Sequence, residues 1–177
     1  VADVGLEITN NSFSGGISNT GLIDADSLGV RVSASSFSGG IRNNGSIHAR
    51  LHEAINITSQ SFTGGIHNLT TGEEDARIKS DLDTAILITG ALNSFSGGIE
   101  NSGSITGKLD AIQLSGFTFG DGVSNTGVIE STGAGTGIEV VATSFTGGIT
   151  NTGTLAWISG VHGINVSGGN VFGDGIF

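Results

Sequence analysis

The sequence is built from repeats of about 25 residues. One phrase, Ser-Phe-x-Gly-Gly-Ile-x-Asn, occurs at 12–19, 36–43, 61–68, 94–101 and 144–151, and a variant of it fills 118–125. A partial copy lies at 172–176. A period of this length is the signature of a repeat architecture, in which each unit packs only on the units before and after it. The phenylalanines mark the period: Phe13, Phe37, Phe62, Phe95, Phe119, Phe145 and Phe172.

Two shorter segments repeat in phase with that phrase and alternate with period 2. One is apolar-x-apolar, such as Val-Arg-Val at 30–32, and the other is Gly-x-Ile, such as Gly-Ser-Ile at 45–47. Alternation with β-branched residues is typical of strands, and strands this short cannot form an independent sheet. Leucine-rich repeats need a helical arc, and a propeller needs four strands in about 40 residues. The sequence therefore predicts an all-β parallel β-helix (solenoid) of about seven coils, with roughly 25 residues and three short strands per coil.

Stacking places equivalent positions of successive coils in columns. The phenylalanine column is expected to face inward, and burial of such a side chain contributes about 1.5–3 kcal/mol. The paired glycines that follow each phenylalanine are expected to have positive φ or to approach the next coil closely. One column is polar yet nearly uniform, and we expect it to form a hydrogen-bonded ladder at a turn. Its members are Asn19, Asn43, Asn68, Asn101, Asn125 and Asn151.

Composition excludes several classes of function. The chain has 16 acidic and 6 basic residues, a net charge of −10, which is the opposite of the basic footprint of a nucleic-acid-binding protein. Because cysteine is absent, a disulfide framework, a thiolate zinc site and a cysteine nucleophile are excluded. No segment approaches the roughly 20 apolar residues that cross a bilayer. We therefore expect no nucleic-acid partner and no membrane-spanning segment in this chain.

The sequence contains no motif for a cofactor, a metal or a catalytic residue, and we expect none of the three. His48 and His52 are interpreted as solvated turn residues, because a metal site needs a third convergent ligand. We expect Glu7 and Arg31, which face outward on neighbouring coils, to form an exposed ion pair. An enzymatic hypothesis depends on one charged cluster: Arg77, Lys79, Asp81 and Asp83.

The third repeat carries an insertion. Asn68 is ten residues before Ile78, whereas Asn19 is only four before Ile23, so six extra residues must leave the coil in an acidic loop at 69–75. Insertions on solenoids often carry recognition, although a solvated loop without a role is the other interpretation. The candidate contact residues of this loop are Thr71, Glu73, Glu74 and Asp75.

The string Ser-Phe-Ser-Gly-Gly-Ile-x-Asn-x-Gly-x-Ile, found at 12–23 and 94–105, resembles repeats in the passenger domains of bacterial autotransporters (type V secretion). The resemblance covers essentially the whole chain. It implies a right-handed β-helix that is exported through an outer-membrane barrel and displays adhesive or effector elements at the bacterial cell surface. It implies no site residues, because the functions of such passengers lie in variable insertions.

The leading hypothesis is an extracellular structural and adhesive module without catalytic activity. Residues 1–177 are expected to form one β-helix domain of a longer repeat protein, because neither end has the polar cap that a solenoid needs. Expected partners are a host or neighbouring cell surface, through a glycan or a protein, and further copies of the chain through its uncapped ends. Two alternatives stay open. One is a fragment of a polysaccharide-processing enzyme, and the other is a self-associating surface filament or an ice- or crystal-binding module.

Overall fold

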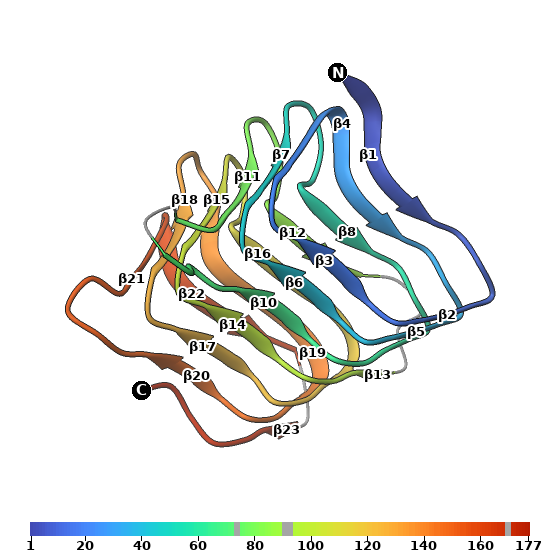
Figure 1. Ribbon diagram of the computed structural model, residues 1–177. Coiled ribbons are helices and arrows are strands. Elements are labelled where there is room, and N and C mark those ends of the chain that lie inside the picture. The colour runs from blue at the N-terminus through green and yellow to red at the C-terminus, as the bar shows by residue number, and fades with distance from the viewer. Residues whose placement is uncertain (73–74, 90–93, 169–170) are drawn as a thin grey trace.

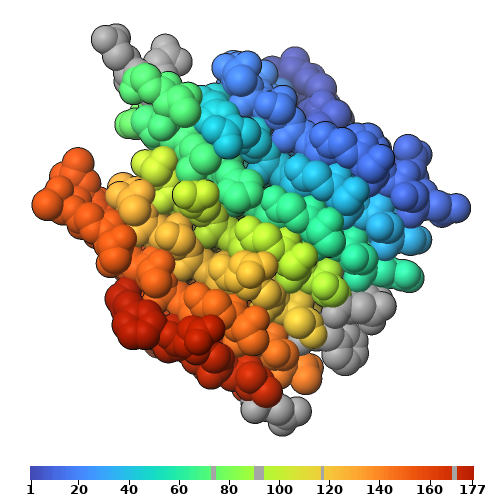
Figure 2. Space-filling view, turned by 60° about the horizontal axis from the view of Figure 1, so that its bottom comes forward, coloured from blue at the N-terminus to red at the C-terminus, as the bar shows by residue number. Residues whose placement is uncertain are grey.

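The computed structural model is a stack of coils whose strands lie side by side along one axis, with the two termini at opposite ends (Figure 1). It describes residues 1–72, 75–89, 94–168 and 171–177, except for the side chain of Phe117. Within these ranges there is no helix, and hence none that could cross a membrane. The predicted all-β solenoid is confirmed, with about six turns instead of seven, since seven phenylalanines enclose six intervals. Successive coils form parallel bands in the space-filling view (Figure 2).

Four columns of strands run along the stack. The apolar-x-apolar segments form the first column, and the phenylalanines form the second. The first column contains β1 (Ala2–Ile8), the end of β4 (Leu22–Val32), β8 (Ile55–Ile57), β12 (Ile86–Ile88), the start of β16 (Ile112–Phe119), the start of β19 (Thr136–Phe145) and β22 (His162–Ser167). The second contains β2 (Ser12–Ser14), β5 (Ser36–Ser38), β9 (Ser61–Phe62), β13 (Ser94–Phe95), the ends of β16 and β19, and β23 (Val171–Phe172).

The third and fourth columns hold the Ile-x-Asn and Gly-x-Ile segments. The third column is a six-stranded sheet of its own, and the other three belong to a single sheet of 17 strands. The third contains β3 (Ile17–Asn19), β6 (Ile41–Asn43), β10 (Ile66–Asn68), β14 (Ile99–Asn101), β17 (Val123–Asn125) and β20 (Ile149–Asn151). The fourth contains the start of β4, then β7 (Ser46–Ala49), β11 (Arg77–Ser80), β15 (Ser104–Gly107), β18 (Val128–Ser131) and β21 (Trp157–Ser159).

The middle phrase of each repeat forms two strands where we expected one. Between Phe37 and Ile41 the chain passes through Gly39 (φ 101°) and Gly40 (φ 68°), and two left-handed residues cannot continue a strand. The glycine pairs thus have positive φ as predicted. A Cβ on Gly40 would also collide with the carbonyl group of Gly64 in the next coil. Each coil therefore has four short sides.

The pairing register places like residues on like, as the repeats predict. All seven phenylalanines of the second column are Cα partners in turn, from Phe13↔Phe37 to Phe145↔Phe172. Four adjacent pairs of rings stack, among them Phe37 and Phe62, whose ring centroids lie 4.7 Å apart at an interplanar angle of 7°. The rings of Phe95 and Phe119 are tilted by 40°. Phe37 and Phe62 are fully buried. Together with the isoleucines of the other columns, these rings form one continuous core along the stack.

The asparagine column forms the predicted ladder. Each side chain donates from Nδ2 to Oδ1 of the asparagine in the next coil at 2.7–2.8 Å, from Asn19 through to Asn151. The same Nδ2 groups lie within hydrogen-bonding distance of carbonyl oxygens near the start of the fourth column. The ladder therefore fixes the turn between the third and fourth columns, and with it the position of the outward side chains of the fourth column.

Candidate functional site

The outward side of the fourth column carries the densest cluster of charged side chains in the described part of the chain. We call the outward surface of the start of β4, β7, β11 and β15 the charged face. In β11 the side chains alternate strictly, with Arg77 and Lys79 exposed and Ile78 and Ser80 buried. The buried residues anchor the strand in the core, so that the two cations project from a rigid base.

His48 lies at the centre of this face and joins three successive coils. Its Nδ1 is 2.9 Å from Oδ1 of Asp24 in the preceding coil, and its Nε2 is 2.9 Å from Oδ2 of Asp81 in the following coil. Ionised carboxylates only accept hydrogen bonds, so both contacts are hydrogen bonds only when both ring nitrogens carry a proton. The imidazole ring of His48 is thus held between two carboxyl groups.

The cationic side chains of Arg50 and Lys79 complete the network. Arg50 donates to Oδ2 of Asp24 at 2.7 Å and to Oδ1 of Asp26 at 3.2 Å, and Lys79 Nζ is 2.7 Å from Oδ1 of Asp81. The hydrogen bond from Arg50, and then that from His48, lowers the pKa of Asp24 below its ordinary value. The hydrogen bond from Lys79 is the main cause of a lowered pKa at Asp81. Both carboxyl groups are therefore held in the ionised form.

The network binds successive coils together. Every carboxylate oxygen of Asp24 and Asp81 lies within 2.9 Å of a nitrogen atom of His48, Arg50 or Lys79. These contacts hold the charged side chains in fixed positions on the surface.

The structure brings together most of the cluster on which the enzymatic hypothesis depends. Arg77, Lys79 and Asp81 project from the charged face. Asp83 does not join them: its Oδ2 lies 3.8 Å from Nδ1 of His52, and its Oδ1 accepts the backbone N–H of Thr84. Asp83 therefore belongs to the corner after β11.

The interpretation of His48 as a turn residue is wrong. His48 lies within β7, where its outward position follows from the alternation with buried Ile47 and Ala49. In the described residues no group of three or more His, Asp or Glu side chains has the geometry to hold a metal ion. The expected pair of Glu7 with Arg31 is present at 3.3 Å.

The insertion at 69–75, which the structure describes at 69–72 and at Asp75, leads into β11 of the charged face. Leu69 still pairs with the preceding coil, and the buried Ala76 donates its N–H to Oγ1 of Thr70 at 3.3 Å, which closes the base of the loop. Two of its candidate contact residues, Thr71 and Asp75, are exposed. The other two, Glu73 and Glu74, lie outside the described residues.

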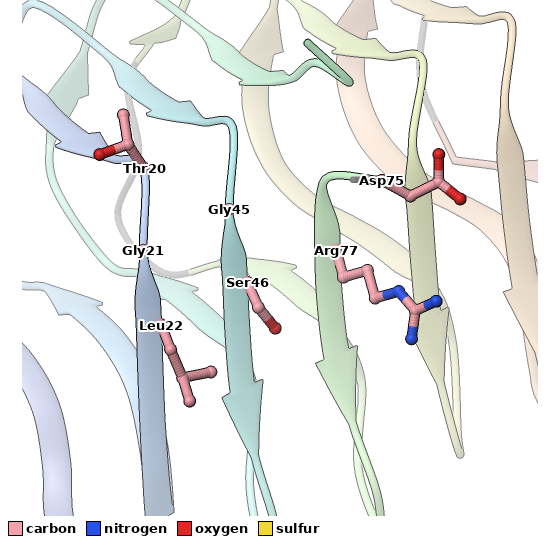
Figure 3. A pocket seen from close by; sticks show the side chains of 7 residues that line it. All are labelled: Thr20, Gly21, Leu22, Gly45, Ser46, Asp75 and Arg77. Carbon is pink, nitrogen blue, oxygen red and sulfur yellow. The ribbon is translucent and has the colours of Figure 1, made fainter. Parts of the chain in front are cut away.

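Three shallow hollows run across the charged face, and Arg77 lines all of them. The largest has a volume of about 650 Å³ (Figure 3). It forms because the glycines just before β4 and β7, and the serine that begins β7, leave the surface low beside the long side chain of Arg77. Its lining consists of Thr20, Gly21, Leu22, Gly45, Ser46, Asp75 and Arg77.

Sequence reasoning missed Asp24, His48 and Arg50 as a group. The signal was available, because Asp24 and His48 both stand five residues after their ladder asparagines, at Asn19 and Asn43. Extending the columns by one outward position would have paired Asp24 with His48. The contact with Asp81 is diagonal, and side-chain conformation decides it.

The fold and the site define a class: a parallel β-solenoid repeat protein with one charged lateral face. Comparison with family models, curated proteins and solved structures finds no match to the chain. The function must therefore be argued from the charged face itself.

Proposed function

We propose that the chain is an extracellular structural and adhesive module, in the manner of an autotransporter passenger, and that the charged face contacts the target. The observation that carries the proposal is that three neighbouring hollows and the ion network lie together on one side of the stack, beside Asp75 at the end of the insertion. A rigid stack of coils, held together by the asparagine ladder, can present a binding surface at a distance from the point where the protein is attached to its cell. The target is a glycan or protein on a host or neighbouring cell.

The test uses labelled chain 1–177 on arrays of glycans and on intact bacterial and epithelial cells. Ser46→Trp obstructs the two hollows that Ser46 lines, including the largest, and binding should fall at least tenfold. Asn56→Trp, an outward position on β8 in the first column, is the matched control and should bind like the unaltered chain. Absence of binding by the unaltered chain, or equal binding by both variants, would contradict the proposal.

A second candidate is a polysaccharide-processing enzyme, and the observation in its favour is the meeting of Arg77, Lys79 and Asp81 beside His48. Turnover of an acidic glycan that is lost in Asp81→Asn would replace the adhesive proposal. The filament or ice-binding alternative has less support, because the outward column through Asp24, His48 and Lys79 mixes charges where a regular threonine column is required.

A further inference from the structure

Arg77 differs from most of the other basic residues of the chain. Four basic side chains bond to an oxygen of a described residue, as ion pairs or as a hydrogen bond to Asn44: Arg31, Arg42, Arg50 and Lys79. The guanidinium group of Arg77 bonds to no described residue, although it stands in the middle of the charged face. Asp75, two residues away, also lines the largest hollow without forming an ion pair with it (Figure 3). None of the five N–H donors of Arg77 thus forms a hydrogen bond with a described residue.

The hollow offers three kinds of contact besides this cation. Thr20 and Ser46 supply hydroxyl groups, and Asp75 supplies a carboxylate that accepts hydrogen bonds from hydroxyl donors. Leu22 is 68% exposed at the edge of the hollow and provides an apolar contact. The volume of about 650 Å³ lies within the range that holds a small ligand.

We propose that this hollow binds a sugar residue that carries a carboxylate. The planar guanidinium of Arg77 matches a carboxylate with two parallel hydrogen bonds. Asp75 repels the ligand carboxylate and accepts from its hydroxyl groups, which orients the ring, and Leu22 packs against the C–H face of the sugar. This inference rests on the proposed adhesive function and names the ligand class of the same face.

A singly charged planar anion fits this hollow better than a phosphate or a sulfate. The neighbouring cations Arg50 and Lys79 each lie 2.7 Å from an aspartate oxygen, whereas Arg77, the third cation of this face, bonds to no described residue. A dianion would leave one charge facing Asp75 in a chain of net charge −10.

The experiment is a titration of ¹⁵N-labelled chain 1–177 with methyl β-D-glucuronoside, followed by amide chemical shifts. Methyl β-D-glucoside has the same hydroxyl groups without the carboxylate, and acetate has the carboxylate alone. We expect the glucuronoside to shift the amides of Leu22, Ser46 and Arg77 and to bind at least tenfold more tightly than either comparison compound. Affinity should fall with rising salt, because the contact is an exposed charge pair.

Arg77→Gln keeps the hydrogen-bonding length of the side chain without the charge, and it should weaken glucuronoside binding at least tenfold. Lys108→Gln removes an exposed cation outside the lining of the three hollows and should leave it unchanged. Equal affinity for glucuronoside and glucoside, or equal loss in both variants, overturns the inference.

If the chain binds cells through the charged face while the glucuronoside titration is silent, this inference fails and the adhesive proposal stands. If the glucuronoside binds but Ser46→Trp leaves cell binding intact, the adhesive proposal fails instead.

Discussion

Asn68 shows how one polar side chain can hold three coils together. Its Oδ1 accepts from Asn43 at 2.8 Å, while its Nδ2 lies within 3.3 Å of Oδ1 of Asn101 and of the carbonyls of Ala76 and Ser104. The residue is fully buried, so each of these groups would be left without water if its partner were removed. In a stack of identical turns, every rung supports the rungs above and below it.

Replacing Asn68 with alanine should destabilise the fold by about 1–3 kcal/mol, because it leaves the buried carboxamide oxygen of Asn101 without its donor and removes one acceptor from the amide of Asn43. Asn56→Ala is the control, since this asparagine faces outward on β8 and should change the free energy of unfolding by less than about 0.5 kcal/mol. Urea denaturation of both variants measures the difference. Similar losses in both would mean that the ladder has no special role.

Two glycines at equivalent positions allow a test of close coil approach. A Cβ on Gly45 would collide with the carbonyl of Gly21, whereas a Cβ on Gly21 would meet nothing within 4 Å. Gly45→Ala should therefore lower the melting temperature by several degrees, and Gly21→Ala should leave it unchanged or raise it slightly through the unfolded state. Circular dichroism provides the comparison. A tolerated Gly45→Ala would indicate a wider coil spacing than the structure has.

At the scale of the strand, the ion network of the charged face links β4, β7 and the end of β11. The pKa of Asp24 is lowered mainly by Arg50, and that of Asp81 mainly by Lys79. A carboxyl group with a lowered pKa in the folded state stabilises the fold above its ordinary pKa of 3.8, and the stabilisation disappears as the pH falls through the lowered value. The network therefore stabilises the stack at neutral pH and loses this effect in acid.

The melting temperature should accordingly fall as the pH drops below about 4. Asp24→Asn should lower the melting temperature at pH 7 and reduce its dependence on pH in the acid range. Asp3→Asn alters an exposed carboxyl that forms no ion pair with the described residues, and it should behave like the unaltered chain. Thermal melts at pH 2–7 decide the matter, and an Asp24→Asn curve parallel to the control would argue against the network.

Strand positions were predictable from the sequence, and side-chain partners less so. The phenylalanine and asparagine columns follow from period alone, because backbone pairing forces equivalent residues together. The middle phrase could have been predicted to form two strands, because positive φ at two consecutive residues, Gly39 and Gly40, ends a strand. The meeting of His48 with Asp81 crosses from one outward column to the next, so it depends on side-chain torsions that no repeat pattern encodes.

At the scale of the whole molecule, the stack presents apolar side chains where its coils end. In the last coil Ile176 is 52% exposed and Phe177 is 73% exposed, although the isoleucine equivalent to Ile176 one coil earlier, Ile149, is fully buried. Unpaired strand edges beside apolar surface favour addition of another chain. Repulsion between chains of net charge −10 opposes this association, and salt screens the repulsion.

Chain 1–177 should therefore self-associate in sedimentation velocity at moderate salt, with sedimentation coefficients that rise with concentration. The double variant Ile176→Lys with Phe177→Lys should reduce the association. Leu82→Lys changes a leucine that is 57% exposed on the side of the stack and should have no effect. If Leu82→Lys alone dissolves the oligomers, the association occurs between sides of the stack and the end-to-end proposal is wrong.

The coil period can be measured directly by disulfide formation, because the chain has no cysteine of its own. Arg31 and Asn56 are Cα partners on adjacent coils and both face outward, whereas Leu87 lies one coil further along in the same column. A disulfide needs Cα atoms within about 7 Å, and two coils separate residues by about 10 Å. We expect the double variant Arg31→Cys with Asn56→Cys to form an intramolecular disulfide rapidly under mild oxidant. The double variant Arg31→Cys with Leu87→Cys should form none within a monomer. The reverse order of reactivity, or no intramolecular bond in either pair, would contradict the stacked coils on which the charged face depends.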